Sequence, residues 1–416
     1  MKKILFFNLL ILLGFSVIGQ QLRRFDFTEK TNNTKSYYKI ISKENLEVAV
    51  TYKNDNFDSY KGDVYLPDTV RWRGKTYKVV AIADSAFYSS KRLGNVYLSK
   101  SIKTIGEGAF ELSSITNLFN TEYLYSIKAG ALSNCKNLYS FIIGNKTKEI
   151  GDYAFDNSGI TNLTIACDSI INDKALNNMS SLKEVTLLDA DCKYINSNTF
   201  TGTNNIQTLN YNANNFSSIS PFENMQSLSK VTIGDKVSSI CENFIRGCKN
   251  ITSIQIPNSV TSISAYAFAE TNIKEIKIPS SIKEMGIAVF KDNKALQTVI
   301  LPDNLGVIVE NTFEGCENLN TINIPSSLFE ISDLAFHNCT SLSEITLPES
   351  IETIGKESFA NCISLQNIFF LGSNPPEIEN EAVFPQNVEM NIDCNYILNY
   401  KNTERWKDLS YPCSLD

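Results

Sequence analysis

The residue types that most often carry enzyme chemistry are scarce and isolated in this chain. It contains one histidine, His337, and a serine or cysteine nucleophile usually needs such an imidazole as its base. Cys339 lies two residues further on, but the sequence places no third side chain where it would orient the imidazole. His337 also occupies a turn position that other segments fill with Tyr88, Glu111 or Lys291, so we expect a solvated turn residue. The sequence therefore predicts no catalytic residues and a protein that is not an enzyme.

The ten cysteines could form disulfides or bind metal, and their spacing argues against metal. No two of them have the two-to-four-residue ligand spacing of zinc sites, so we predict no metal and no cofactor. For disulfides we consider Cys394 with Cys413, near the end of the chain, and Cys167 with Cys192. The other cysteines include five that recur three residues before the leading aliphatic residue of a repeated segment. In that position we expect free cysteines that pack as small apolar residues; the five are Cys135, Cys248, Cys316, Cys339 and Cys362.

The charge pattern limits the kinds of partner. The formal net charge is −7, and loss of Lys2 and Lys3 by processing would make it −9. Carboxylates are scattered, and lysine and arginine form no cluster or stripe along the sequence. Because phosphate binding requires clustered basic side chains, we expect no nucleic-acid partner and no affinity for an anionic membrane surface.

The N-terminal residues have the pattern of an export signal. Lys2 and Lys3 precede an apolar run from Ile4 to Ile18, and Val17 and Gly19 are small enough for cleavage before Gln20. An uncleaved membrane anchor is the alternative, but it would need roughly 20 apolar residues. We predict a signal peptide over 1–19, no membrane insertion after its removal, and an extracellular, cell-surface or periplasmic protein.

A repeated sequence motif runs through most of the chain, and the fold that it builds must position any binding residues. It consists of an aliphatic residue, two variable residues, an apolar residue, one variable residue and a third apolar residue, and it recurs thirteen times at intervals of 22 to 24 residues. Such a short unit can bury its apolar face only against neighbouring copies, so the pattern predicts a β-rich solenoid of parallel strands. The leading positions are Leu93, Ile115, Leu138, Ile160, Leu182, Ile206, Leu228, Ile251, Ile273, Leu296, Leu319, Leu342 and Leu365.

Each coil of this solenoid has a predictable inner and outer side. Side chains alternate across a strand, so the second and third apolar residues of the motif point inward and the residue between them points outward. A phenylalanine recurs in a later turn of most coils, from Phe87 to Phe359, with Leu132 and Leu176 in two of them. We expect these aromatic side chains to form a ladder in the core.

The two ends of the chain depart from the repeat. Alternating apolar residues from Leu46 to Tyr52 and a hairpin turn around Gly74 predict a β-rich cap over 20–78, which shields the first coil. The solenoid follows over 79–372. Pro375 and Pro376 break the pattern, and a short amphipathic helix between 396 and 409 is expected in a C-terminal cap over 373–416.

Several segments resemble the BspA-like class of bacterial leucine-rich repeats. The resemblance is carried by ITSIQIPNSVTSISAYAF (251–268) and LSEITLPESIETIGKESFANC (342–362), by the leader segments 38–53 and 74–87, and by the tail segment 395–409. It implies a leucine-rich-repeat solenoid of roughly 13 coils with an N-terminal and a C-terminal cap. It also implies an exported or surface-attached protein, because some members of that class act as adhesins for host matrix proteins or other bacteria.

The outer face of the leading strands is the candidate binding surface. Most of its outward positions are Thr or Asn, as on a solvated sheet, but the first three coils place Tyr97, Phe119 and Ile142 there, with Tyr139 alongside. An exposed apolar patch often marks a contact site; the alternative is that the leader cap or an irregular coil covers it. We predict an exported, non-enzymatic binding protein that recognises host or bacterial surface proteins, and the alternative is a glycan-binding surface protein that captures polysaccharide.

Overall fold

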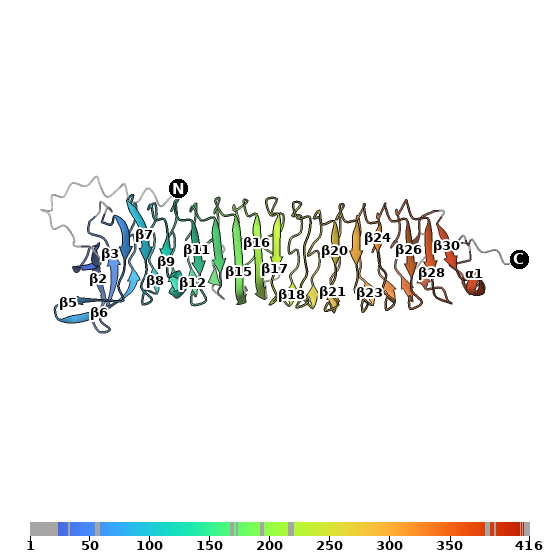
Figure 1. Ribbon diagram of the computed structural model, residues 1–416, viewed down its shortest axis with the longest axis horizontal. Coiled ribbons are helices and arrows are strands. Elements are labelled where there is room, and N and C mark those ends of the chain that lie inside the picture. The colour runs from blue at the N-terminus through green and yellow to red at the C-terminus, as the bar shows by residue number, and fades with distance from the viewer. Residues whose placement is uncertain are drawn as a thin grey trace, which may run out of the picture.

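Figure 1 shows coils stacked along one axis, from the N-terminal cap to a short helix at the other end. The fold is a leucine-rich-repeat β-solenoid of about 13 turns with parallel strands, as the sequence predicts. The computed structural model describes residues 24–31, 34–54, 59–166, 170–171, 174–191, 195–214, 220–378, 383–386, 388–407, 409 and 411. The predicted signal peptide and three of the cysteines in the predicted disulfides, Cys167, Cys192 and Cys413, lie outside these ranges.

The leading strands of successive coils form what we call the front sheet. Its strands pair in parallel ladders, because each coil repeats the register of the one before. In order they are β4 (Gly62–Tyr65), β7 (Leu93–Tyr97), β9 (Leu118–Phe119), β11 (Ser140–Ile143), β13 (Asn162–Ile165), β15 (Glu184–Asp191), β16 (Thr208–Asn214), β17 (Lys230–Ile233), β20 (Glu275–Lys277), β22 (Thr298–Ile300), β24 (Thr321–Ile322), β26 (Glu344–Leu347), β28 (Asn367–Phe370) and β30 (Glu389–Ile392).

Shorter strands form the second sheet on another side of the coils, after the turn that ends each front strand. Most of them are two residues long, and they also pair in parallel. They are β6 (Lys75–Ile82), β8 (Thr104–Ile105), β10 (Ser126–Ile127), β12 (Glu149–Ile150), β14 (Ile170–Ile171), β18 (Ser239–Ile240), β19 (Ser262–Ile263), β21 (Glu284–Met285), β23 (Val307–Ile308), β25 (Glu330–Ile331), β27 (Thr353–Ile354) and β29 (Glu377–Ile378).

The N-terminal cap joins both sheets. Strands β1 (Phe27–Thr31), β2 (Thr34–Ser42) and β3 (Glu47–Thr51) are antiparallel, and β3 then pairs in parallel with β6. Strand β5 (Thr69–Trp72) forms the predicted hairpin with β6, and the turn residues Arg73 and Gly74 both have positive φ, 49° and 77°. Glycine reaches this conformation without strain from a Cβ atom. The cap therefore continues the second sheet through β6 and the front sheet through β4.

The core contains the expected aromatic ladder. Phe290, Phe313 and Phe336 are fully buried and stack with ring-centroid distances of 5.8 and 5.4 Å. The same stacking joins Phe87 to Phe110 at 4.7 Å. A phenylalanine fills the space beneath the turn in most coils, with buried Leu132 and Leu176 in two of them, and neighbouring coils depend on each other for their packing.

The five cysteines of the repeat are buried and free, which confirms their packing role. Each thiol donates a hydrogen bond to the carbonyl of a phenylalanine in the preceding coil, for example from Cys339 Sγ to Phe313 O at 3.2 Å. Burial raises the pKa of these thiols, to about 12 in Cys135 and Cys362. They act as small apolar residues that also satisfy a buried carbonyl group.

The C-terminal end is closed by a helix shorter than expected. The sequence predicts helix between 396 and 409, whereas α1 covers Ile397–Lys401 and follows the 3₁₀ turn η3 (Cys394–Tyr396). The chain then turns, and Trp406 packs edge-on against Phe370 and Tyr400 while its indole N–H donates to Pro376 O at 3.0 Å. Cys394 is disulfide-bonded, and its pairing with Cys413 stays a prediction.

Candidate binding face

Three aromatic rings form a stacked column at the N-terminal end of the front sheet. Tyr65 of β4, Tyr97 of β7 and Phe119 of β9 are register partners across adjacent strands. The rings of Tyr65 and Tyr97 are 4.3 Å apart and tilted by 2°, and those of Tyr97 and Phe119 are 4.6 Å apart and tilted by 12°. We call these three residues the aromatic column. Their arrangement follows from the strand period, because the preceding residue in each strand points into the core.

The aromatic column is accessible from the solvent side. Tyr65 is 38% exposed and Phe119 is 41% exposed, while Tyr97 is half-buried because a neighbouring ring lies against each of its faces. Ile142, at the corresponding position of β11, is 46% exposed. The structure therefore stacks two of the four residues that the sequence singles out, Tyr97 and Phe119, and leaves Ile142 exposed on the next front strand. Their part in binding stays a prediction.

Tyr139 lies apart from that line. It is 60% exposed, but it precedes β11, three residues before Ile142, which corresponds to roughly 10 Å along a strand. Ser140 occupies the face between them. Tyr139 therefore lies at the start of its strand, whereas the aromatic column lies near the ends of the strands, so Tyr139 does not extend the column.

Sequence reasoning missed Tyr65 because it assigned that residue to the cap. The signal was present: Asp63-Val64-Tyr65-Leu66 repeats the pattern of Asn95-Val96-Tyr97-Leu98. In both strands the valine is fully buried and the tyrosine faces outward. The cap thus lengthens the aromatic column by one ring.

A polar column runs beside the aromatic one and is hydrogen-bonded along its length. The amide of Asn95 donates to Asp63 Oδ2 at 3.2 Å, and the amide of Asn117 donates to Asn95 Oδ1 at 2.8 Å. Further along, Glu184 accepts from Asn162 and Asn210 at 2.7 and 2.8 Å. Because these groups bond to each other across coils, they hold the front sheet in register and prearrange its polar surface.

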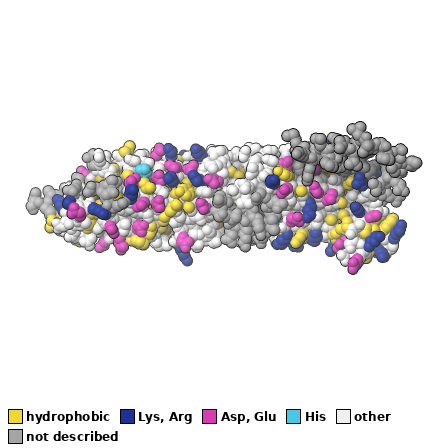
Figure 2. All heavy atoms as spheres, turned by 180° about the vertical axis from the view of Figure 1, so that it is seen from behind, with side chains coloured by type: hydrophobic (Ala, Val, Ile, Leu, Met, Phe, Trp, Pro, Cys, Tyr) yellow, Lys and Arg dark blue, Asp and Glu magenta, His cyan; other side chains and the backbone are white. Residues whose placement is uncertain are grey.

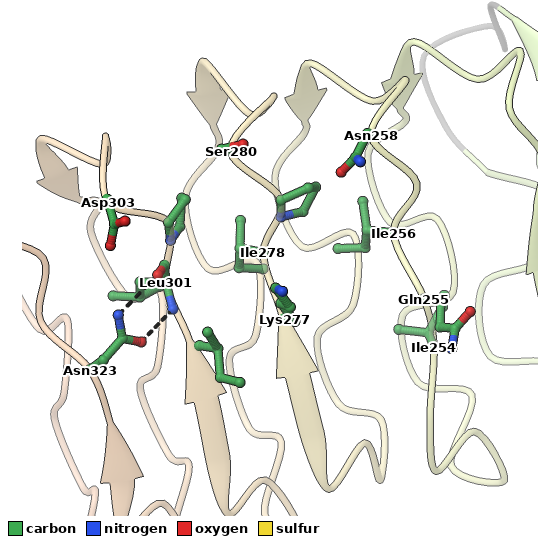
Figure 3. A pocket seen from close by; sticks show the side chains of 13 residues that line it. Ile254, Gln255, Ile256, Asn258, Lys277, Ile278, Ser280, Leu301, Asp303 and Asn323 are labelled. Carbon is green, nitrogen blue, oxygen red and sulfur yellow. Dashed lines mark hydrogen bonds between the residues drawn. The ribbon is translucent and has the colours of Figure 1, made fainter.

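The C-terminal half of the front sheet carries an open groove of about 740 Å³. It lies where residues 251–257, which form no strand, separate β17 from β20. Figure 3 shows Lys277, Asp303 and Asn323 around the isoleucines of this region. The side-chain amide of Asn323 donates to Leu301 O at 3.0 Å and accepts from Leu301 N at 2.7 Å. It replaces a backbone pairing beyond the short strand β24, so this amide is already hydrogen-bonded within the sheet.

His337 is not the solvated residue that we expected. Its side chain is 18% exposed, because residues one repeat away stack on it from both sides: Glu314 Oε1 is 3.9 Å from its Nδ1, and Asn361 Nδ2 is 3.2 Å from its Nε2. The Cys339 thiol donates to a carbonyl instead of meeting the imidazole. Within the described ranges no group of three or more His, Cys, Asp or Glu side chains could hold a metal ion.

The prediction that basic residues form no cluster is wrong for the folded chain. Lys100, Lys103 and Lys146 lie around the ring of Tyr123, with their Nζ atoms 5.3, 5.9 and 5.1 Å from its centroid. Lys146 lies 43 positions after Lys103, but Tyr123 is one repeat from both Lys100 and Lys146, and residues one repeat apart lie side by side in a solenoid. From behind, Figure 2 shows Lys and Arg side chains grouped over the N-terminal coils, at its right.

Among the described residues, the structure contains no helix that is both long and apolar enough to span a membrane.

The chain belongs to a family of bacterial repeat proteins. The family described as "BspA type Leucine rich repeat region (6 copies)" matches residues 75–182, 169–297 and 289–391, which is more than half of the chain. No curated protein matches the chain.

One solved structure supports the fold, and others are more distantly similar. A leucine-rich repeat protein from Bacteroides ovatus is 22% identical with a TM-score of 0.54, and the alignment covers 86% of this chain and 92% of that one. A leucine rich cell surface protein from Faecalibacterium prausnitzii is 18% identical with a TM-score of 0.32, covering 83% and 95%. The pneumococcal vaccine antigen PcpA is 16% identical with a TM-score of 0.32, covering 91% and 96%.

Membership of this family supports a role in binding. Proteins of the BspA type are typically non-enzymatic, and they are typically exported or displayed at the cell surface. The partner of this chain is a separate question, which the geometry of the front sheet addresses.

Proposed function

We propose that this protein is exported and recognises another protein through the front sheet, in adhesion to host or bacterial surface proteins. The observation that carries the proposal is the aromatic column of Tyr65, Tyr97 and Phe119, accessible on the front sheet, with exposed Ile142 on the next front strand. Aromatic side chains at the centre of an interface contribute much of its binding free energy. Stacked rings have lost most of their rotational freedom before the partner arrives, so binding costs less entropy.

The tyrosine hydroxyls add directional contacts to this apolar surface. The pKa of Tyr97 is raised by desolvation first, then by its hydrogen bond with Tyr65 and by the charge of Asp63. Like any tyrosine at neutral pH, Tyr97 keeps its hydroxyl proton, so its oxygen can take part in hydrogen bonds at the rim of the column. An apolar ring edge with a polar tip is the pattern enriched at protein interfaces.

The stacking weighs against glycan capture by the aromatic column. A sugar ring packs on an open aromatic face, whereas both faces of Tyr97 lie against other rings. Only the outer faces of the two end rings, those of Tyr65 and Phe119, are not stacked within the column. We therefore place protein recognition ahead of glycan binding at this part of the front sheet.

A variant of the whole aromatic column tests the proposal. Tyr65, Tyr97 and Phe119 are replaced together by serine, and the purified protein is compared with the parent in pull-downs from extracellular matrix and from bacterial surfaces. For a captured protein, we expect affinity to fall by roughly thirtyfold, the effect of losing about 2 kcal/mol at an interface hot spot.

A matched control separates a binding effect from a general loss of exposed apolar surface. Phe329 and Ile363 are 43% and 79% exposed and lie outside the strands of the front sheet, and their replacement by serine should leave affinity unchanged. Equal binding by the column variant and the parent, with both folded by circular dichroism, would remove the aromatic column as the binding site.

A further inference from the structure

Four lysines from the cap, the first coil and the third coil meet beside the front sheet. Lys100, Lys103 and Lys146 surround Tyr123, and Lys78 of β6 lines a neighbouring pocket of about 480 Å³ together with Lys100 and Lys103. We call these four residues the lysine corner. It lies where the front strands turn into the second sheet, and the coil between Lys100 and Lys146 contributes Tyr123.

The positive charges of the lysine corner are not neutralised by the protein. Within the described part of the chain, none of the four ammonium groups forms an ion pair with a carboxylate. Asp68 is the acidic residue that lines the pocket, and its Oδ1 already accepts from the Ser101 backbone N–H at 3.3 Å. Glu149, on a neighbouring coil, pairs with Lys128 at 2.8 Å.

Lys103 is held at the centre of this group. Its ammonium donates to Lys100 O at 2.7 Å and to Tyr123 O at 3.4 Å. Burial lowers the pKa of Lys103, and the charges of Lys146 and Lys78 lower it further, while Asp68 opposes them. Several like charges held together without a counterion form a site that a bound anion would stabilise.

We propose that the lysine corner binds an acidic polysaccharide that lies along the solenoid axis. Strands of adjacent coils are about 4.8 Å apart, so Lys100 and Lys146, two coils apart, are separated by roughly 10 Å along that axis. This spacing is close to the repeat between charges in a polysaccharide whose alternate sugars carry a carboxylate or sulfate. Lys100 and Lys146 can therefore contact two successive charges of one polysaccharide chain.

The aromatic neighbours favour a sugar polymer over other polyanions. Tyr125 stands between Lys103 and Lys148 in the same column of the second sheet and is 55% exposed, so its ring is available to a sugar ring. A nucleic acid would need more phosphate contacts than four lysines provide, and it would meet a chain of net charge −7. The proposed site uses residues outside the aromatic column and does not depend on the proposed protein partner.

Binding of heparin, polygalacturonate, neutral dextran and poly-glutamate to the purified protein tests this site. We expect at least one acidic polysaccharide to bind, with an affinity that falls as salt rises, while dextran does not bind and poly-glutamate binds more weakly. Replacing the exposed Lys100 and Lys146 by glutamine should weaken that binding by roughly tenfold. The double variant should bind proteins as the parent does.

The control is a double variant that removes two lysine charges outside the lysine corner. Lys183 and Lys249 are exposed and lie outside the corner, so their replacement by glutamine should leave polysaccharide binding unchanged. Equal weakening in both double variants would show a general charge effect and overturn the site. Absence of binding to both acidic polysaccharides, or tighter binding of poly-glutamate, would overturn the assignment to a glycan.

Discussion

Replacement of one ring of the core ladder should destabilise the protein far more than replacement of an exposed ring of the same type. Phe313 is fully buried between Phe290 and Phe336, whose ring centroids are 5.8 and 5.4 Å away. Its backbone N–H donates to Ala335 O at 2.8 Å, so the coil is fixed to the next one and cannot close around a cavity. For Phe313→Ala we expect the free energy of unfolding to fall by about 3–5 kcal/mol.

Urea denaturation followed by circular dichroism measures this loss, and hydrogen exchange locates it. Exchange should accelerate most in the coils around residue 313, because each coil is stabilised by its immediate neighbours. The control is Phe329→Ala, since Phe329 is 43% exposed, and its cost should stay below about 1 kcal/mol. A similar loss for both variants, or a loss for Phe313→Ala below about 1 kcal/mol, would refute the idea of a core carried by stacked rings.

Two further predictions follow from buried groups. The thiols of Cys316, Cys339 and Cys362 should resist a thiol reagent at pH 8 in the folded protein and react promptly in denaturant, because burial raises the pKa of each; rapid labelling of the folded protein would contradict their packing. Burial also raises the pKa of Tyr60, whose hydroxyl donates to Thr51 O at 2.6 Å, so its contribution to stability is complete below pH 10 and declines as pH rises toward the raised pKa. Thermal melts between pH 9 and 12 should show this decline in the parent and a smaller one in Tyr60→Phe, and identical profiles would exclude Tyr60 as its source.

The repeat made the fold predictable, because its period fixes which residues face inward in every coil. The buried rings from Phe87 to Phe359 and the free cysteines of the repeat follow directly from that period. The outward positions of Tyr97, Phe119 and Ile142 follow in the same way. The end of the helix at Lys401 did not follow from the period, because the segment that packs Trp406 against Phe370 and Tyr400 lies outside the repeat.

What sequence reasoning missed depends on contacts between coils. The lysine corner is assembled from residues such as Lys103 and Lys146, which lie 43 positions apart in the sequence. Only one coil lies between the two coils that carry them. His337 was expected in solvent because its own turn is polar, whereas Glu314 and Asn361 of adjacent coils enclose it. Tyr65 was missed because the boundary of the cap was placed after a strand that already follows the repeat.

Hydrogen exchange of the protein bound to a captured partner tests the central claim most directly. Binding through the front sheet predicts slower exchange in β4, β7, β9 and β11, the strands of the aromatic column and Ile142, with little change in the second sheet at β23, β25 and β27. Protection confined to the second sheet or to the turns would contradict the account, and so would an unchanged pattern in the variant that lacks Tyr65, Tyr97 and Phe119.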